Sequence, residues 1–367
     1  MTFNRYRLGE VCSFIDYRGK TPRKTTSGIP LITAKIVKNG FIGKPDEFIA
    51  EEDYDSWMRR GIPRKGSVIL TTEAPLGEVA RIPSDDRFAF AQRIIVLEPM
   101  QEILDAGYLY YALLDSILMD RIKSRATGTT VTGIKAAELK KVEIDCPPIE
   151  TQKRVASLLS SLDQRIENNE SINDNLLQQA QALYASIFYT NADPNWPSGH
   201  LADLITVKYG KDHKKLADGS IPVFGSGGIM RYVERPLYTQ ESVLIPRKGT
   251  LNNVMYVNEP FWSVDTMFYS EMKQANVAKF VYHFLRSKDL ASMNAGSAVP
   301  SMTTDILNAM ELVIPPDDVL AGFEGIVAPM YAMMQANERE SSKLAQLRDT
   351  LLPRLMSGEI DVSSITI

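Results

Sequence analysis

One long stretch of the sequence occurs twice. The segment GTTVTGIKAAELKKVEIDCPP, which starts at Gly128, aligns with GSAVPSMTTDILNAMELVIPP, which starts at Gly296, at an offset of 168 residues. The same offset continues downstream without a gap, so that Leu183 still aligns with Leu351. Because two copies of one sequence adopt one plan, we expect the chain to fold as two related halves.

The match extends upstream with larger offsets. The run SVIL from Ser67 aligns with SVLI from Ser242, and GIPLI from Gly28 aligns with SIPVF from Ser220, so the second copy has shorter loops. These runs, together with RIIVLEP from Arg93, are typical of short β-strands bounded by Gly, Pro and Asn turns.

Each copy also contains one predicted helix near the end of its mixed segment. YLYYALLDSILMDRI from Tyr108 has apolar residues at helical spacing, and VAKFVYHFL from Val277 repeats the pattern. Strands and helices in one segment predict the α+β class. The two mixed segments, residues 1–148 and 199–316, are the expected globular domains.

A long helix is predicted after each mixed segment, over residues 149–190 and 317–357. Each follows a Pro-Pro pair, which cannot lie inside a helix, and apolar residues then recur at three- and four-residue steps. Forty residues of helix extend about 60 Å, and an apolar stripe of that length needs a partner. We expect the two helices to pair antiparallel as a coiled coil around a pseudo-two-fold axis, separating the two domains. In the alternative, each helix folds back on its own domain.

Composition is ordinary for a globular protein of two domains. A chain of 367 residues with 44% hydrophobic and 23% charged residues is neither disordered nor fibrous. The N-terminus lacks the apolar core of a signal peptide, and no run approaches the roughly eighteen apolar residues of a membrane span, so we expect a cytoplasmic protein. Cys12 and Cys146 are far apart and are predicted to be buried thiols.

Motifs for nucleotide binding and methyl transfer are incomplete. Gly19-Lys20-Thr21 resembles the end of a phosphate-binding loop, but Phe14 stands where the first glycine is required. In Asp145-Cys146-Pro147-Pro148 a cysteine interrupts the amino-methyltransferase motif, and Ile149 replaces the aromatic residue that stacks on the target base. We therefore predict no catalytic residue, metal or cofactor on this chain.

Basic residues gather in turn-rich stretches of both copies, which indicates phosphate contacts with DNA. The net charge of −4 argues mildly against DNA binding, but the local distribution of charge matters more. For any one cluster, a solvated loop is an equally good explanation. The predicted phosphate contacts are Arg18, Lys20, Arg23, Lys24, Lys208, Lys211, Lys214, Lys215, Arg247 and Lys248. The predicted base readers in polar loops are Thr33, Lys35, Thr71, Thr72, Glu73, Ser226, Arg247, Asn252 and Asn253.

Two helix motifs resemble those of a known family. The first helix opens as PPIETQKRVASLLSSLDQRIENNESINDNLLQQAQAL from Pro147, and the second ends as LRDTLLPRLMSGEI from Leu347. With two mixed domains alternating with two long helices, the whole chain resembles the specificity subunits of Type I restriction-modification systems. The second helix opening, PPDDVLAGFEGIVAPM from Pro315, departs from the pattern because it lacks the Glu-x-Gln portion.

The resemblance implies a DNA-reading subunit. In that family each target-recognition domain reads one half of a bipartite, asymmetric DNA site, and the helices set the unspecified spacer between the halves. The same subunit docks two modification subunits, which methylate adenine at N6, and through them the restriction and translocase subunits. S-adenosylmethionine, ATP and magnesium are then expected on those partner subunits and not on this chain.

Two other functions are weighed against this one. If the chain were half of a split methyltransferase, it would bind S-adenosylmethionine by itself. The incomplete motifs count against this function. A coiled-coil scaffold joining two protein-binding heads would not bind DNA. Binding of S-adenosylmethionine to the isolated chain, and of DNA to the reconstituted complex, separates the three.

Overall fold

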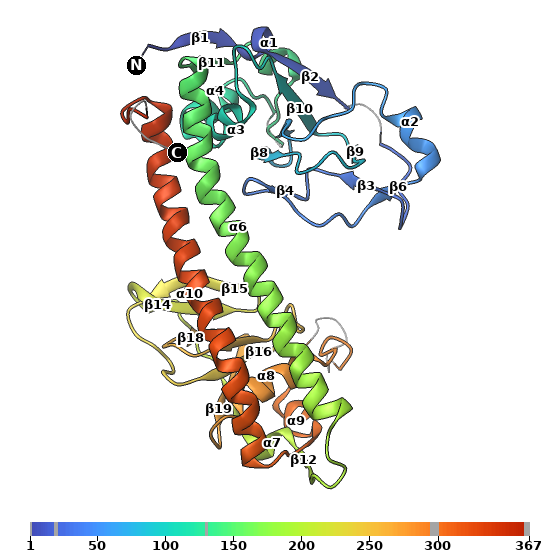
Figure 1. Ribbon diagram of the computed structural model, residues 1–367, viewed down its shortest axis with the longest axis vertical. Helices are drawn as coiled ribbons and strands as arrows, with labels where there is room; N and C mark the ends of the chain where they lie inside the picture. Colours follow the sequence, from blue (N-terminus) through green and yellow to red (C-terminus); the bar gives the residue numbers. More distant parts are fainter. Residues whose placement is uncertain (1, 18–20, 129–130, 294–300, 363–367) are drawn as a thin grey trace. The chain divides into compact units, whose positions relative to one another are not determined.

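The computed structural model describes residues 2–17, 21–128, 131–293 and 301–362, which form two compact units (Figure 1). The first unit contains residues 1–168 and 339–367, and the second contains residues 169–338. Two long helices, α6 (Ile149–Ala185) and α10 (Asp317–Met356), each contribute one part to each unit. Mixed strands and helices confirm the α+β class, and a long helix does occupy the predicted range from residue 149.

A four-stranded antiparallel sheet with the order β2-β10-β7-β8 organises the first unit. Alternate residues of its central strands belong to two separate cores, with Val68 and Leu70 on one face and Ile69 on the other. A second sheet, β6-β3-β9, packs on the second of these cores, and β1 pairs with β11. The strands are β1 (Asn4–Arg7), β2 (Cys12–Asp16), β3 (Ile29–Ile32), β4 (Val37–Lys38), β5 (Phe41–Ile42), β6 (Phe48–Ile49), β7 (Val68–Thr72), β8 (Leu76–Arg81), β9 (Ala89–Phe90), β10 (Ile94–Pro99) and β11 (Glu143–Cys146).

The second unit contains the same kinds of sheet. Its four-stranded antiparallel sheet has the order β13-β19-β16-β17, a three-stranded sheet has the order β15-β14-β18, and β12 pairs with β20. Val243 and Ile245 again face one core while Leu244 faces the other. The strands are β12 (Ser198–His200), β13 (Ile205–Tyr209), β14 (Asp218–Gly225), β15 (Gly228–Val233), β16 (Ser242–Pro246), β17 (Met255–Val257), β18 (Trp262–Ser263), β19 (Met267–Met272) and β20 (Glu311–Val313).

The helix predicted from Tyr108 is two helices, so that prediction was wrong. The chain becomes extended at Asp115, whose carboxylate accepts a hydrogen bond from the backbone N–H of Ile117 and caps the second helix. The short helices are α1 (Leu8–Val11), η1 (Glu51–Asp53), α2 (Tyr54–Trp57), α3 (Ala106–Leu114), α4 (Ser116–Lys123), α5 (Ala136–Leu139), the π-helical turn η2 (Ser186–Thr190), α7 (Leu201–Leu204), α8 (Ala278–Arg286) and α9 (Thr304–Asn308).

Within each unit the parts of α6 and α10 run side by side in opposite directions. In the first unit, Arg348 of α10 donates a hydrogen bond to the buried carboxylate of Asp163 of α6 over 2.9 Å. In the second unit, the side chain of Asn173 of α6 bonds both the carbonyl of Met334 (3.1 Å) and the side chain of Asn337 (2.8 Å) of α10. These contacts fix the local pairing of the helices in both units.

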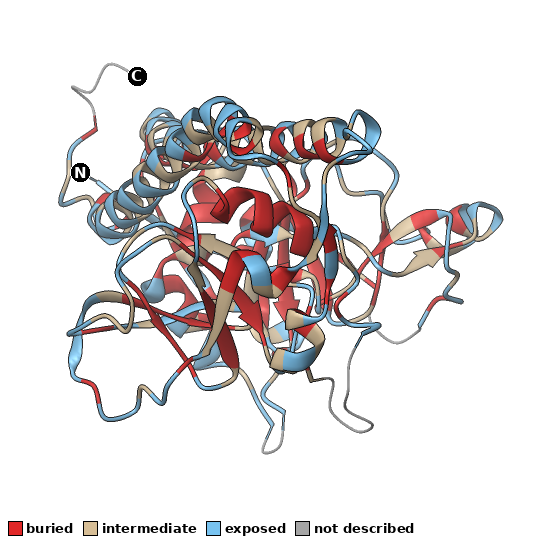
Figure 2. Cartoon of the chain, turned by 90° about the horizontal axis from the view of Figure 1, so that it is seen from below, coloured by how far each residue is buried: buried red, intermediate tan, exposed pale blue. Residues whose placement is uncertain are grey.

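The long helices are exposed along one side, whereas buried residues gather in the strands and short helices (Figure 2). Among the described helices, α10 alone is apolar enough to cross a membrane by length and composition, with a mean hydropathy of 1.2 over its most apolar window. Its residues Leu320, Phe323 and Val327 are, however, fully buried in the core of the second unit.

Candidate nucleic-acid interface

The strand ends of the first unit bring several predicted base readers together. Strands β2 and β7 both run antiparallel to β10, so both end at the edge of the sheet where β10 begins. Thr72 and Glu73 lie at the end of β7, and Arg93 directly precedes β10. Thr33 follows β3, and the neighbouring Ile32 carbonyl accepts a hydrogen bond from the Ala91 N–H, near Arg93 in the chain. We call Thr33, Thr72, Glu73 and Arg93 the first edge.

An ion pair joins the two sides of the first edge. The Nε of Arg93 lies 3.1 Å from Oε1 of Glu73, and both side chains are nearly half exposed. The backbone is left-handed at Arg93 (φ 73°) and at Ala74 (φ 49°), which neighbours Glu73. Such backbone is uncommon for residues other than glycine, and strained residues of this kind cluster at functional sites.

The strand ends of the second unit form a corresponding surface. Arg247 and Lys248 follow β16, Lys211 follows β13, and the turn that contains Ser226 links β14 to β15. Arg247 donates from Nε to the Asp265 carbonyl (3.1 Å). Its guanidinium lies 5.8 Å from the ring centre of Tyr209. Asn253 donates to the Ser226 carbonyl (2.8 Å), which ties the loop after β16 to the β14–β15 turn. We call Tyr209, Lys211, Ser226, Arg247, Lys248 and Asn253 the second edge.

Backbone hydrogen bonds make the two edges equivalent. In the first unit Thr72 N–H donates to the Arg93 carbonyl and the Thr72 carbonyl accepts from Ile134 N–H. In the second unit Arg247 N–H donates to the Thr266 carbonyl and the Arg247 carbonyl accepts from Met302 N–H. Thr72 therefore corresponds to Arg247, Glu73 to Lys248 and Arg93 to Thr266, so the same backbone presents different side chains in the two units.

Four buried side-chain atoms lack a hydrogen-bond partner within the described part of the chain, and all lie in or beside the two edges. They are Thr33 Oγ1 and Thr72 Oγ1 in the first unit, and His213 Nδ1 and Ser263 Oγ in the second. The Ser263 carbonyl accepts a hydrogen bond from Lys211 N–H, which places it at the second edge. Buried polar atoms normally have partners, so the hydrogen bonding among the described residues is incomplete at these four atoms.

Other predicted site residues have partners within the protein. Lys24 pairs with Glu47 (2.8 Å), Lys35 with Asp46, and Lys208 with Glu271 (3.6 Å). The Thr71 hydroxyl donates to the Pro75 carbonyl and accepts from Glu78 N–H, while Asn252 bonds Asp289 and the Ala291 N–H. These contacts give Thr71 and Asn252 a structural role.

The remaining predicted residues are exposed or undescribed. Arg23, Lys214 and Lys215 are exposed on loops. Arg18 and Lys20 lie outside the described residues.

Sequence reasoning missed Arg93 and Tyr209. Arg93 opens the run RIIVLEP, where the pattern indicates a strand, and no neighbouring basic residue marks it. Tyr209 is exposed over 54% of its surface, and a single aromatic residue at a strand end carries no sequence signal of a site. Only the strand pairing places the two residues at the edges.

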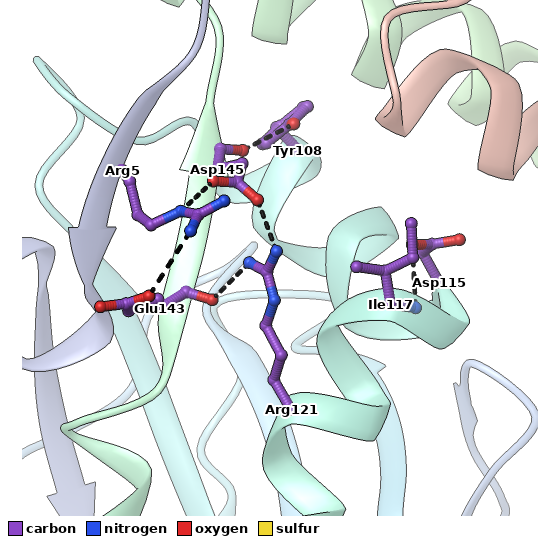
Figure 3. Close-up of polar contacts among 7 residues, drawn as sticks. All are labelled: Arg5, Tyr108, Asp115, Ile117, Arg121, Glu143 and Asp145. Atoms are coloured by element: carbon purple, nitrogen blue, oxygen red, sulfur yellow. Dashed lines mark hydrogen bonds and ion pairs between the residues drawn. The ribbon is translucent and has the colours of Figure 1, made fainter.

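A second candidate is a cavity of about 310 Å³ in the first unit, between β1, β11, α3, α4 and the end of α10. Arg5 and Arg121 both bind the carboxylate of Asp145, each over 2.7 Å (Figure 3). Burial alone would raise the pKa of Asp145, but the hydrogen bonds from the two guanidinium groups hold it below its ordinary value. Both guanidinium groups are therefore already paired with Asp145, so we do not interpret the cavity as a site where the two arginines bind an added anion.

The second unit has a corresponding cavity of about 280 Å³. Leu312 and Val313 of β20 line it where Ile144 and Asp145 of β11 line the first cavity. Phe188 and Tyr189 lie at the offset of 168 residues from Met356 and Ser357, which line the first cavity. The two cavities are therefore equivalent in position, although the second is more aromatic. No group of three metal-ligating side chains occurs among residues that the structure describes.

Comparison with known proteins identifies the family. A family model described as Type I restriction modification DNA specificity domain matches residues 2–178 and 194–319. The matched ranges cover most of the chain and include both candidate edges. This chain therefore belongs to the family of Type I restriction-modification specificity subunits.

Relatives match over nearly their full length. The Type I restriction enzyme MjaIX specificity subunit of Methanocaldococcus jannaschii is 24% identical, and the alignment covers 98% of this chain and 93% of the relative's length. The HindI specificity subunit of Haemophilus influenzae is 19% identical over 89% of this chain and 93% of its own. The crystal structure of the Type I restriction-modification S subunit from M. genitalium has the same fold, with a TM-score of 0.61, 19% identity, and coverage of 97% and 96%.

Proposed function

We propose that this chain is a non-catalytic subunit that reads a bipartite, asymmetric DNA site, one half with each edge. The observation that carries the proposal is the pair of equivalent edges, which share backbone hydrogen bonds but differ in side chains. Equivalent surfaces dock on DNA in the same way, and different side chains select different bases. An asymmetric site follows because Glu73 and Arg93 of one edge are replaced by Lys248 and Thr266 of the other.

The two units are proposed to be copies of one ancestral unit whose long helices form an antiparallel coiled coil. The matching strand orders and the opposite directions of α6 and α10 in each unit support this interpretation. A helix shared by both units transmits the displacement of one end to the other. The helices would then set the length of the unspecified spacer between the half-sites.

Two modification subunits are the proposed partners, and through them the restriction and translocase subunits. The equivalent cavities at the ends of β11 and β20 support two docking positions for two copies of one partner. Methyl transfer and cleavage would belong to these partners, which would bind S-adenosylmethionine, ATP and magnesium in the cytoplasm. The net charge of −4 fits a complex whose partners share the phosphate contacts.

Exchange of one recognition domain tests the proposal. Residues 1–145 are replaced with the equivalent domain of a relative, the complex is reconstituted with modification subunits, and N6-methyladenine is mapped by single-molecule sequencing. We expect one half-site to change and the other to stay the same. The matched exchange of residues 199–316 should change only the other half. A change in both halves from either exchange would refute independent reading heads.

Two assays test the competing functions. Transfer of labelled methyl groups from S-adenosylmethionine to DNA by the isolated chain would establish a split methyltransferase and contradict the non-catalytic role. A reconstituted complex that does not shift DNA of random sequence in a gel would establish a scaffold without a DNA role.

A further inference from the structure

We propose that Arg93 and Arg247 each read one guanine, so that each half-site contains a G·C pair recognised by an arginine whose Nε contacts a neighbouring group of the protein. This inference rests on the proposed function, because it names the base class that each edge selects. It adds a specificity residue, Arg93, that the pattern of basic clusters does not mark.

Arg93 forms an ion pair with Glu73 at the Nε end of its guanidinium. Its Nε lies 3.1 Å from Oε1 of Glu73, and its side chain remains 48% exposed. Glu73 is in turn placed by the short bridge between its backbone and Gly133. An ion pair at the Nε end leaves the outward N–H groups of the two terminal nitrogens, Nη1 and Nη2, available to another acceptor. Glu73 is thus a positioning residue for Arg93.

Arg247 is restrained by a backbone carbonyl and an aromatic ring. Its Nε donates to the Asp265 carbonyl over 3.1 Å, and the ring of Tyr209 lies 5.8 Å from the guanidinium carbon. Among the described residues, no acidic side chain forms an ion pair with Arg247. The carbonyl and the ring restrict the guanidinium on two sides, and Nη1 and Nη2 remain available to a ligand.

The paired terminal nitrogens match guanine better than any other base. Guanine presents two acceptors, O6 and N7, on its major-groove edge, and two parallel N–H donors of one guanidinium bind both. Adenine and cytosine place an amino donor at the corresponding position, and thymine offers a single acceptor. A guanidinium that is already oriented loses less conformational freedom on binding, which favours direct reading.

The position of the two arginines on the sheet supports base reading over phosphate contact. Lys214 and Lys215 lie on a loop, where long mobile cations suit a charge that is spread along a backbone. Arg93 and Arg247 instead flank paired strands, and their backbones bond to Thr72 and Thr266. The left-handed backbone at Arg93 (φ 73°) is the kind of strain that occurs where a side chain must be aimed.

Binding competition with the reconstituted complex tests the proposal. The unaltered complex is first mapped to obtain its site, and each base pair of that site is then changed in turn in competitor DNA. Arg93→Ala should lower discrimination at one G·C pair in the half read by the first unit, by roughly 5- to 140-fold. Sequence discrimination at every other base pair of the site should stay unchanged. Arg247→Ala should do the same at one G·C pair in the other half.

Three further variants separate reading from folding. Arg93→Asn keeps a residue that tolerates left-handed backbone, so its loss of guanine discrimination should match that of Arg93→Ala. Glu73→Gln should weaken discrimination at the same base pair, and combining it with Arg93→Ala should add nothing. Arg87, an exposed arginine of the same unit that pairs with Glu51, provides the control, and Arg87→Ala should leave the site unchanged.

The outcomes distinguish failure of this inference from failure of the proposed function. If the Arg93 variants weaken binding equally on all sequences and lower the salt slope, Arg93 contacts phosphate and the inference is wrong. It is also wrong if no G·C pair in the first half-site responds to Arg93. In both cases the domain exchange still changes one half-site. If the exchange changes neither half, the proposed function itself fails.

Discussion

The buried His283 should make the second unit sensitive to acid. His283 of α8 is fully buried, its Nδ1 lies 2.7 Å from Oε1 of Gln181 in α6, and its Nε2 lies 2.9 Å from the Tyr331 hydroxyl in α10. Burial, aided by the charge of Arg286, lowers the pKa of this imidazole to about 3. The neutral ring thus links both long helices to the domain, and the charged ring is excluded from the folded state.

The size of the effect follows from proton linkage. In the unfolded chain the pKa of His283 returns to 6.5, so below that pH the unfolded state takes up a proton that the folded state does not. The stabilising effect of the neutral ring is fully present above pH 6.5 and is lost as the pH falls toward about 3. At pH 5 the loss is ~2 kcal/mol of unfolding free energy, from about 1.5 pH units at ~1.36 kcal/mol each.

The assay compares the protein with His283→Gln, whose amide can donate to Gln181 and accept from Tyr331 without titrating. Urea unfolding is followed by tryptophan fluorescence at pH 7 and pH 5 in a Trp57→Phe background, where Trp196 and Trp262 both report on the second unit. The parent should lose about 2 kcal/mol more than the variant between the two pH values. Equal losses in the two proteins would refute the reasoning, because all other titrating groups are common to both.

Three further outcomes are expected. Reversing the charge of Lys214 and Lys215 together should weaken DNA binding on all sequences and flatten the salt dependence of the binding constant. Loss of sequence discrimination with an unchanged salt dependence would assign the two lysines to base reading. Four residues inserted after Asn175 lengthen α6 by about 6 Å and rotate its end by roughly 40°. Methylation mapping should therefore show a spacer that is longer by about one base pair. An unchanged spacer with full activity would mean that the helices do not set the distance between the half-sites. Asp163→Ala removes the buried carboxylate that accepts hydrogen bonds from Tyr111 and Arg348. Thermal unfolding should show that the first unit loses about 3 kcal/mol or more of unfolding free energy. A loss of unfolding free energy within about 0.5 kcal/mol would show that the contact contributes little to stability.

The regular elements were largely predictable because local patterns determine them. The runs SVIL, RIIVLEP and SVLI are confirmed as strands β7, β10 and β16, and the stripe of apolar residues after Pro148 is confirmed as α6. A buried strand needs consecutive apolar residues and a long helix needs apolar residues at helical steps, so both leave clear signals.

The helix from Tyr108 failed as a prediction because one side chain overrides the pattern. Apolar spacing continues from α3 into α4, but Asp115 bonds the backbone of Ile117 and starts a new helix. Asp competes with helical backbone bonds in this way at many helix ends, and spacing alone does not reveal it.

The edges were predictable only in part because they depend on which strands are neighbours. Glu73 was expected as a reader from its polar loop, but its partner Arg93 is 20 residues away in the chain. The two meet because β7 and β10 are paired, and that pairing is a tertiary contact. Charge clustering in the sequence therefore finds Lys214 and Lys215 on their loop and misses an isolated arginine at a strand end.

The equivalence of the edges shows how the two units present different side chains on the same backbone. At Thr72 and Arg247 both the backbone N–H and the backbone carbonyl are bonded to neighbouring segments, over 2.8 and 2.9 Å in the first unit and over 2.9 Å in the second. These bonds hold the strand ends whatever side chain stands there, since no side-chain atom takes part in them. A threonine and an arginine occupy equivalent positions on the same backbone, and so do a glutamate and a lysine at Glu73 and Lys248. Under the proposed function, side chains at these positions would change the bases selected while the backbone that positions them stays the same.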